Sequence, residues 1–353
     1  MRIFTLDVGS GTQDFMLSES LNCTDCKVVR NSVKMILPSP TRIVASKIER
    51  SKDVFLHGYT MGGGPCKKAA FEHAKNYRVV ATERAALSFS DDLEKVREVG
   101  IEVVGESKNL PNEFTAIEMK DVDWEFFTYC LDRLGIDYPD LAIVAVQDHG
   151  YSVKKSNRRF RFEFFEKMLR KGAKLSDFVY NSREVPEVYN RMRSVVESYY
   201  DSGKPFGELY VVDTVFAAMA GCAAEAREFP ALVMNFGNSH FVGAVVEEDG
   251  RILSMFEHHT RIVEERGKEW ISNFINRFIR GEVDFEDVYE DGGHGAYVGE
   301  VVEVRDAVST GPRVELSPCR VASSCGEVMI TGNVGMLSLL EQVLENQEDD
   351  KRT

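Results

Sequence analysis

A strand, a glycine-rich turn and a second strand fill residues 2–17, and this feature limits the fold more than any other. The first strand is an apolar run that ends on Asp7, and the turn that follows carries Gly9 and Gly11. Alternating strands around a short glycine turn predict a β-hairpin. Glycines lack a Cβ, so backbone N–H groups can converge there on an anion. Two interpretations stay open: an ordinary turn served by Asp and Gly, or an anion site where Asp7 holds a bridging cation.

Length, composition and charge exclude several classes of protein. A chain of 353 residues can bury a large core and suggests two domains. Its 43% hydrophobic content argues against wholesale disorder. A net charge of −14 argues against nucleic acid or an anionic membrane surface as a partner. With no apolar run near the ~20 residues of a membrane span and no secretory signal pattern, we expect a cytoplasmic protein. The oligomeric state leaves no signal in the sequence.

The cysteines allow two interpretations. Their number, seven, is odd, and a disulfide framework is not expected in such a chain. Cys23 and Cys26 form a C-x-x-C pair, and Cys319 and Cys325 form a looser pair downstream. Four thiolates could bind a metal if the fold joins the two pairs; otherwise the thiols are reduced and unliganded. The sequence lacks the C-x-x-x-C-x-x-C motif of radical enzymes built on S-adenosylmethionine.

Alternating strand and helix patterns in the first half indicate an inserted subdomain at about 38–135. Within it, the glycine-rich stretch 58–65 opens a helix. A helix N-terminus behind glycines is a ready anion site. The stretch is therefore either a second contact to phosphate or substrate, or a flexible connection.

A continuous apolar run at 141–146 predicts a strand that is buried on both faces. Asp148 and His149 follow at its carboxyl end, where ligands bind in open α/β sheets. They are a candidate acid–base couple; alternatively, His149 only caps the strand end. The arginines at 158–161 are interpreted as a solvated helix face, offset locally by nearby glutamates.

Three later stretches complete the pattern. Asp213 is followed by very small residues up to Gly221. A turn at 235–240 joins two strand patterns in the same way as the first turn. Residues 327–331 predict a last strand, which a glycine turn at 332–335 connects to a closing helix.

Taken in order, these segments resemble the signature segments of the actin-like ATPase superfamily, which includes actin, heat-shock chaperone ATPases and sugar kinases. The turns at 7–12 and 235–240 resemble the two phosphate loops, residues 213–221 the first interdomain connection, and residues 330–335 the adenosine loop. The resemblance implies an α/β fold of two actin-like (ribonuclease H-like) lobes with a nucleotide cleft between them. The first lobe would span 1–229 with its insertion, the second 230–346, and 347–353 would be a frayed tail.

The resemblance also implies ATP and Mg²⁺ as cofactors. Asp7 would hold the metal through water, and Asp213 would orient or deprotonate an attacking water or hydroxyl. The loops would surround the phosphates, and two glycines would flank the adenosine. The implied nucleotide-binding residues are Asp7, Gly9, Ser10, Gly11, Thr12, Asn235, Gly237, Asn238, Ser239, Gly332 and Gly335.

The chain departs from the superfamily at its second phosphate loop. Asn235 stands where an aspartate is usual, and Ser239-His240 replaces a glycine–threonine pair. An amide carries no charge with which to anchor Mg²⁺, so we expect ATP to be held but hydrolysed slowly. The chain is most similar to an archaeal group of unassigned function labelled as pyruvate formate-lyase activating proteins. Three functions compete: a Mg-ATP-dependent phosphotransferase or ATPase acting on a small metabolite, a nucleotide-dependent module that holds a partner protein, and a metallo-activator using the cysteine pairs.

Overall fold

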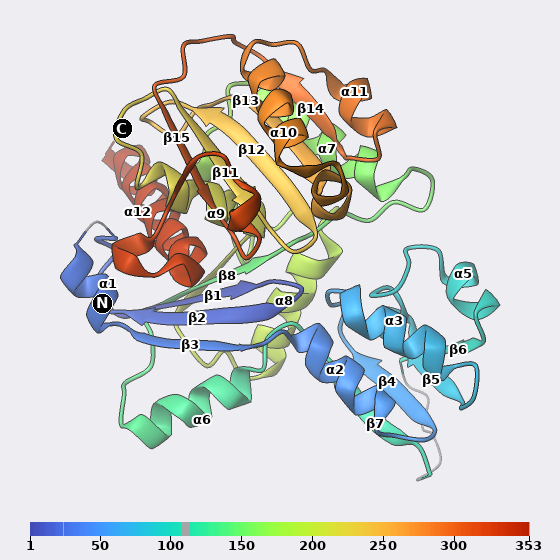
Figure 1. Cartoon of the computed structure of the whole chain (residues 1–353). Coiled ribbons are helices and arrows are strands. Elements are labelled where there is room, and N and C mark those ends of the chain that lie inside the picture. Colours follow the sequence, from blue (N-terminus) through green and yellow to red (C-terminus); the bar gives the residue numbers. More distant parts are fainter. Residues whose placement is uncertain (24, 107–112, 353) are drawn as a thin grey trace.

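The computed structural model describes residues 1–23, 25–106 and 113–352. Two α/β lobes lie one above the other, and a smaller subdomain projects from the side of the lower one (Figure 1). None of the helices in these ranges is long and apolar enough to cross a membrane.

The first lobe is built on a sheet with the strand order β3-β2-β1-β8-β10-β9. β1 pairs antiparallel with β2, and β2 with β3, whereas β8 and β10 run parallel to β1. The short edge strand β9 is antiparallel to β10. The bounds are β1 (Ile3–Val8), β2 (Thr12–Ser18), β3 (Val33–Pro38), β8 (Leu141–Val146), β9 (Val179–Asn181) and β10 (Glu208–Val212).

The second lobe repeats this arrangement. Its order is β14-β13-β12-β11-β15-β16, in which β11, β12 and β13 are antiparallel and β15 and β16 continue parallel to β11. The two-lobed α/β fold predicted from the sequence is confirmed. The bounds are β11 (Ala231–Phe236), β12 (His240–Val246), β13 (Ile252–His259), β14 (Gly295–Val298), β15 (Asp306–Thr310) and β16 (Arg320–Val321).

The inserted subdomain has a parallel four-stranded sheet of its own, ordered β6-β5-β4-β7. It ends with β7 at Met119, whereas the sequence suggested about 135. Helix α6 (Trp124–Leu134) packs instead on the first sheet, where Phe127 contacts the rings of Phe4 and Phe15. The elements are α2 (Pro40–Glu49), β4 (Val54–Gly58), α3 (Gly64–His73), β5 (Val79–Thr82), α4 (Glu83–Ala86), α5 (Leu93–Glu98), β6 (Ile101–Val104) and β7 (Thr115–Met119).

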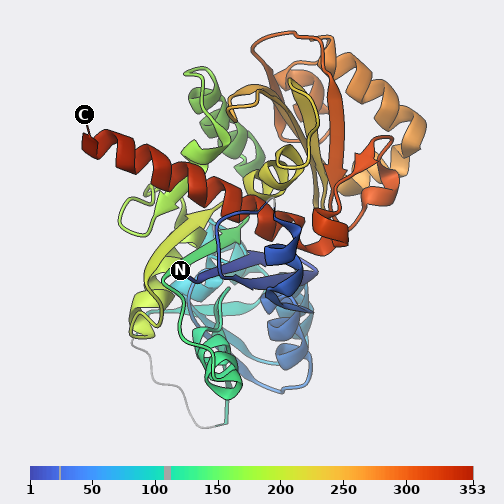
Figure 2. The same cartoon turned by 90° about the vertical axis from the view of Figure 1, so that its left-hand side faces the viewer.

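Two helices, α9 (Thr214–Ala223) and α12 (Thr331–Arg352), pack against each other where the lobes meet (Figure 2). A Cβ on Gly335 would overlap the carbonyl oxygen of Ala217, and one on Gly221 would overlap that of Thr331. The small residues therefore allow the two backbones to touch. The sheets of both lobes share one apolar core around these helices.

The C-terminal segment differs from the sequence-based expectation. Instead of a strand at 327–331, a 3₁₀ turn, η4 (Val328–Ile330), leads directly into α12, whose first turns contain Gly332 and Gly335. Close packing on α9 overrides the low helix propensity of these glycines. The helix continues to Arg352, where a frayed tail was expected at 347–353; residue 353 lies outside the described range.

A disulfide joins Cys26 to Cys325, which connects α1 (Cys26–Asn31) to η3 (Ser324–Gly326). Cys23 and Cys319 are free thiols. The expectation of unpaired thiols is therefore wrong for two residues, and the four-thiolate metal site is excluded because two of its ligands bond to each other. The metallo-activator hypothesis, which used this site, falls with it.

The remaining helices link or cover the sheets. They are α7 (Asn157–Leu169), η1 (Leu175–Phe178), α8 (Asn190–Asp201), α10 (Thr260–Ile279), α11 (Phe285–Glu290) and η2 (Val314–Leu316). Helix α7 precedes the second lobe in sequence but packs against β13 and β14 of that lobe, as Figure 1 shows.

Candidate functional site

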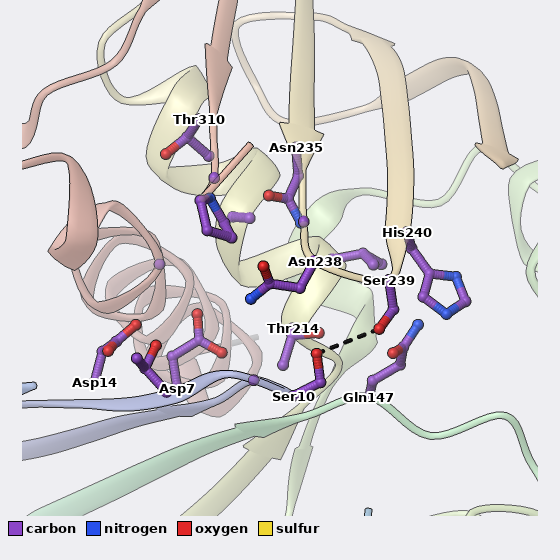
Figure 3. A pocket seen from close by; sticks show the side chains of 18 of the residues that line it. Asp7, Ser10, Asp14, Gln147, Thr214, Asn235, Asn238, Ser239, His240 and Thr310 are labelled. Atoms are coloured by element: carbon purple, nitrogen blue, oxygen red, sulfur yellow. Dashed lines mark hydrogen bonds between the residues drawn. The ribbon is translucent and has the colours of Figure 1, made fainter. Parts of the chain in front are cut away.

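Two hairpin turns of the same construction face each other across the cleft between the lobes. In the first, Gly9 N–H donates to the Thr12 carbonyl at 2.9 Å, and in the second Gly237 N–H donates to the His240 carbonyl at 2.9 Å. The Ser10 and Ser239 hydroxyl oxygens lie 3.3 Å apart and form a hydrogen bond between the two turns (Figure 3). The fold thus brings together two turns that lie more than 220 positions apart in the chain, since the Ser10–Ser239 separation is 229.

Most of the predicted nucleotide-binding residues line one pocket between these turns, but two do not. Gly11 is not on the pocket wall; an added Cβ there would stand 2.7 Å from the side-chain nitrogen of Asn238 in the facing turn. Gly335 serves the contact of α12 with α9 described above, so its predicted place beside the adenosine is not where the structure puts it. The predicted residues on the pocket wall are Asp7, Gly9, Ser10, Thr12, Asn235, Gly237, Asn238, Ser239 and Gly332.

A second carboxylate, which the sequence interpretation missed, accompanies Asp7. Asp14 is the cross-strand partner of Asp7 in the β1–β2 hairpin, and it lines the same pocket. Directly opposed residues of an antiparallel pair project from the same face of the sheet, and Figure 3 shows the two carboxylates together at one end of the pocket. The register of the first hairpin, counted from its turn, was the signal that could have found it.

The two carboxylates are short of positive charge. Burial, followed by the charge of Asp14, raises the pKa of Asp7 well above its ordinary value. Burial raises the pKa of Asp14 to about 6, and its Oδ1 atom lacks a hydrogen-bond partner among the described residues. Oxygen ligands of this kind suit a hard divalent cation, so the residues present fit the Mg²⁺ implied by the resemblance.

Asp213, the predicted base, is held in a buried ion network. Arg161 donates to both of its carboxylate oxygens, at 2.6 and 3.0 Å, and the backbone N–H of Asp148 donates to Oδ2 at 2.9 Å. Asp213 also caps α9 by accepting from Val215 N–H. With both oxygens engaged and a residue exposure of 2%, Asp213 does not present a free lone pair to the pocket.

Arg161 itself corrects another interpretation. The arginines at 158–161 were expected to form a solvated face, yet the Arg161 side chain is fully buried. Its guanidinium bridges Asp213 and Glu257, with Nε 2.9 Å from Glu257 Oε2. Glutamates spaced along the same helix cannot reveal this, because the two acids that neutralise Arg161 come from β13 and from the start of α9.

Asp148 and His149 do not form the predicted acid–base couple. The Asp148 carboxylate accepts from Gly150 N–H and from the N–H groups of Arg191 and Met192 at the start of α8. The His149 ring instead packs near His240 and His294, with centroid distances of 5.5 and 5.6 Å. Burial lowers the pKa of both His149 and His294 well below the ordinary 6.5, so these imidazoles are neutral at pH 7.

A second cavity of about 280 Å³ adjoins the first. Its walls come from the inserted subdomain, including the glycine-rich stretch at Gly62–Gly64, and from residues 147–150 after β8. Gln147 lines both pockets, and its Nε2 atom has no hydrogen-bond partner among the described residues. Ser10, Ser239 and His240 also border both pockets, so the hairpin turns form the partition between them.

The repeated sheets and the facing turns define the class: this is an α/β protein with the actin-like (ribonuclease H-like) fold predicted from the sequence. The chain belongs to the family described as "Putative pyruvate format-lyase activating enzyme (DUF1786)", which matches residues 61–316. No curated protein sequence shows significant similarity to it.

Solved structures show remote similarity. The ethanolamine utilization protein EutJ from Carboxydothermus hydrogenoformans is 11% identical, with 96% of this chain and 90% of that one covered and a TM-score of 0.35. An exopolyphosphatase from Cytophaga hutchinsonii is 9% identical over 89% and 68%, with a TM-score of 0.33. The activator of the 2-hydroxyisocaproyl-CoA dehydratase from Clostridium difficile, with bound ADPNP, is 10% identical over 100% and 98%, with a TM-score of 0.33. Likenesses of this size add nothing to the fold and site described above.

Proposed function

We propose that the chain binds ATP with Mg²⁺ in the cleft between its lobes and acts as a phosphotransferase or ATPase on a small metabolite. The observation that carries this proposal is the pair of matching turns that face each other across one pocket, with Asp7 and Asp14 beside them. Backbone N–H groups of such turns are suited to phosphate oxygens. Two carboxylates next to the turns supply the charge that a phosphate-bound magnesium ion needs.

The rest of the first pocket suits the nucleoside. Val215, Ala218, Pro312 and Met329 give it an apolar wall, and Gly332 lets the Asp7 carboxylate approach α12, because a Cβ there would overlap that carboxylate. Apolar walls with a few fixed polar groups are typical of small-molecule sites. In this proposal the base lies on this wall and the phosphates extend toward the two turns.

The second cavity would hold the acceptor. Its volume of about 280 Å³ admits a small metabolite and not a folded partner. Gln147 lies at the boundary of the two pockets with an unpartnered amide, and a glutamine amide can orient an attacking water or hydroxyl toward a phosphate. We assign it this positioning role. His149 lines the second cavity, and the hydrogen bonds of Asp148 hold the loop that carries Gln147 and His149.

Turnover is proposed to be slow. Both buried acids near the partition, Asp148 and Asp213, are engaged by N–H or guanidinium donors, and the second loop offers the neutral Asn235. This observation also favours a second candidate, a module in which nucleotide binding changes how a partner is held, with little hydrolysis. Acceptor-dependent ATP consumption across a metabolite panel would support the enzyme. Nucleotide-dependent capture of a partner without turnover would support the module.

Calorimetry with ATP and ADP, with and without Mg²⁺, tests the shared core of both candidates. Gly11→Val should weaken binding by more than about tenfold, because a branched side chain would displace the Asn238 amide from its place on the pocket wall. Gly105→Val is the matched control, since a Cβ there meets open space. If the wild type binds neither nucleotide at millimolar concentrations, the proposal fails.

A further inference from the structure

Several histidines lie together at the partition between the two pockets, and the proposed nucleotide site gives this cluster no role. The chain has seven histidines, and one ring nitrogen from each of His149, His240 and His294 lies within 4.8 Å of the other two. The ring of His259 lies next to this group, 5.1 Å from His240 and 4.9 Å from His294 between centroids.

Two of the three rings, those of His240 and His294, are buried, and both have ring nitrogens without a hydrogen-bond partner among the described residues. His294 is fully buried, and both of its ring nitrogens lack a hydrogen-bond partner among the described residues. Buried polar atoms are nearly always paired, and an unpaired one is costly. His240 is 7% exposed and His294 0%, so bulk water has little access to these two rings. Such a site calls for a ligand that accepts several imidazole lone pairs at once.

A carboxylate supports two of the rings from behind. Glu257, which is fully buried, has Oε1 2.9 Å from His240 Nδ1 and Oε2 3.8 Å from His294 Nδ1. Histidines that bind metals commonly give their other ring nitrogen to a carboxylate, which fixes the tautomer and the ring orientation. A proton on His240 Nδ1, facing Glu257 at 2.9 Å, would leave the Nε2 lone pair of His240 for a metal, whereas 3.8 Å from His294 Nδ1 is too long for a hydrogen bond.

The nearby charges favour a cation. Two arginines act on the histidines: Arg161 is matched by two carboxylates, Asp213 and Glu257, and Arg191 is paired with Asp121. Arg161, Asp213 and Glu257 together carry one net negative charge. A divalent cation would therefore meet a compensating charge directly behind its ligands.

We propose that His149, His240 and His294 form a binding site for a divalent transition metal of the zinc class. Three imidazoles with one open position are the ligand set of catalytic zinc sites, and imidazole suits zinc and its first-row neighbours better than Mg²⁺. At a zinc–nitrogen distance of 2.0–2.1 Å, tetrahedral ligands stand about 3.4 Å apart. Binding therefore draws the ring nitrogens together by up to about 1.4 Å, since they lie within 4.8 Å of one another here.

The open position faces the second cavity, because His149 and His240 line that cavity and His294 closes the site from the inside. It would take a water molecule or an oxygen donor of a small molecule bound there. His149 follows β8 of the first lobe, whereas His240 and His294 belong to the second, so the metal also bridges the two lobes. His240 ends the second hairpin turn, which places this site at the opposite end of the first pocket from Asp7 and Asp14 (Figure 3). The site stands whether or not nucleotide binds.

The test is metal binding by the full chain after chelator treatment and dialysis. Equilibrium dialysis with Zn²⁺ and elemental analysis should give about one zinc per chain. With Co²⁺, the visible spectrum should show the intense d–d bands of a four-coordinate nitrogen site. His149→Asn and His294→Gln should each weaken zinc binding by at least about 100-fold, the upper range found for losing even a supporting residue. Glu257→Gln changes a residue that supports the ligands without being one, and it should weaken zinc binding by about 10–100-fold.

Matched controls separate this site from adventitious binding. His57→Gln changes a histidine of the inserted subdomain, and Cys319→Ser removes a partly exposed thiol; both should bind zinc like the wild type. His149 is only half-buried, so its variant should fold even if the His294 variant does not, which far-ultraviolet circular dichroism will show. Substoichiometric zinc in the wild type, or undiminished binding by folded His149→Asn, would overturn the proposal. Zinc that is lost from Cys319→Ser instead would place the metal on thiols.

Discussion

At the scale of single residues, the unusual feature is the pair of acids at the end of the first hairpin. Asp7 and Asp14 oppose each other on one face of the sheet, and their pKa values are raised because they are buried together. A raised carboxyl pKa means that the folded state binds a proton more tightly than the unfolded chain does. The pair therefore costs stability at neutral pH unless a cation is bound.

Replacing Asp14 by Asn should reveal this cost. The folded pKa of Asp14 is about 6 against an ordinary 3.8, so its contribution to the free energy of unfolding falls as pH rises from about 4 to about 6 and is constant above that. Without metal, Asp14→Asn should be more stable than the wild type by about 3 kcal/mol at pH 7.5. The difference should vanish below about pH 4, and Mg²⁺ with nucleotide should reduce it at pH 7.5. Urea unfolding at these two pH values measures it; a variant that is less stable at pH 7.5 contradicts the account.

Asn235 is the counterpart of Asp7 in the second turn, and its neutrality leads to a prediction about metal dependence. Asn235→Asp adds a charge beside the proposed Mg²⁺ site, where even at an effective dielectric near 20 two unit charges ~4 Å apart interact by about 4 kcal/mol. Desolvation of the new acid offsets part of this. The Mg²⁺ concentration that half-saturates ATP binding should fall by about tenfold or more.

Hydrolysis should not rise with it, because both oxygens of Asp213 are already bound by Arg161. Calorimetry over a Mg²⁺ series and phosphate release measure the two effects separately. Asn76→Asp, an exposed position in the inserted subdomain, controls for charge alone. A half-saturating Mg²⁺ concentration that does not fall, or phosphate release that rises in Asn235→Asp and not in Asn76→Asp, would contradict this prediction.

Single residues also show which parts of the site could not be predicted from the sequence. Glycine turns behind an acid can be recognised locally, so the part of the pocket wall that the two turns form was predicted. The surroundings of Arg161 and the ring contacts of His149 depend on which distant strands and helices become neighbours. Helix periodicity and local charge balance carry no information about those partners.

At the scale of elements, the crossing of α9 and α12 decides how closely the two lobes meet. The sequence correctly indicated close approach from the small residues after Asp213, but it placed a strand where α12 begins. Glycine and asparagine at 332–335 resemble a turn when only local propensity is considered. In the fold these residues lie inside the contact between α12 and α9. Because α9 is distant in the sequence, a local sequence pattern cannot reveal this contact.

Gly335→Ala tests this crossing. Alanine favours a helix over glycine by about 1 kcal/mol, yet its Cβ would overlap the Ala217 carbonyl oxygen and approach the Gly221 backbone. Overpacking of this kind costs about 1–3 kcal/mol, and here both contacts are backbone atoms that cannot rotate away. We expect a net loss of about 1–2 kcal/mol in the free energy of unfolding, measured in urea. Gly105→Ala, in open space, should be close to neutral, and a stabilised Gly335→Ala would show that the helices separate easily.

At the scale of the whole molecule, the repeated sheet order was implied by the resemblance and is confirmed, while the connections that tie the lobes together were not foreseen. Arg161 joins an acid from each lobe, and the serine pair bridges the turns. The disulfide adds a covalent connection, and its two cysteines had been assigned to different C-x-x-C-like pairs. Sequence spacing gives no hint that α1 and η3 are neighbours, because they are separated by 299 residues.

This disulfide leads to a prediction about global stability. Cross-linking two residues removes conformational freedom from the unfolded chain, typically by about 2–4 kcal/mol and more for longer loops. The closed loop here is 299 residues, so Cys26→Ser should lower the free energy of unfolding by at least about 2 kcal/mol. A reducing agent should lower it to the same level in the wild type and leave the variant unchanged.

Cys130→Ser, which removes a free and partly buried thiol, is the matched control. Thiol titration of the denatured, unreduced wild type should find five reactive groups and seven after reduction. If all seven react before reduction, or if Cys26→Ser is as stable as the wild type, the two lobes are held by their packed helices and ion pairs alone.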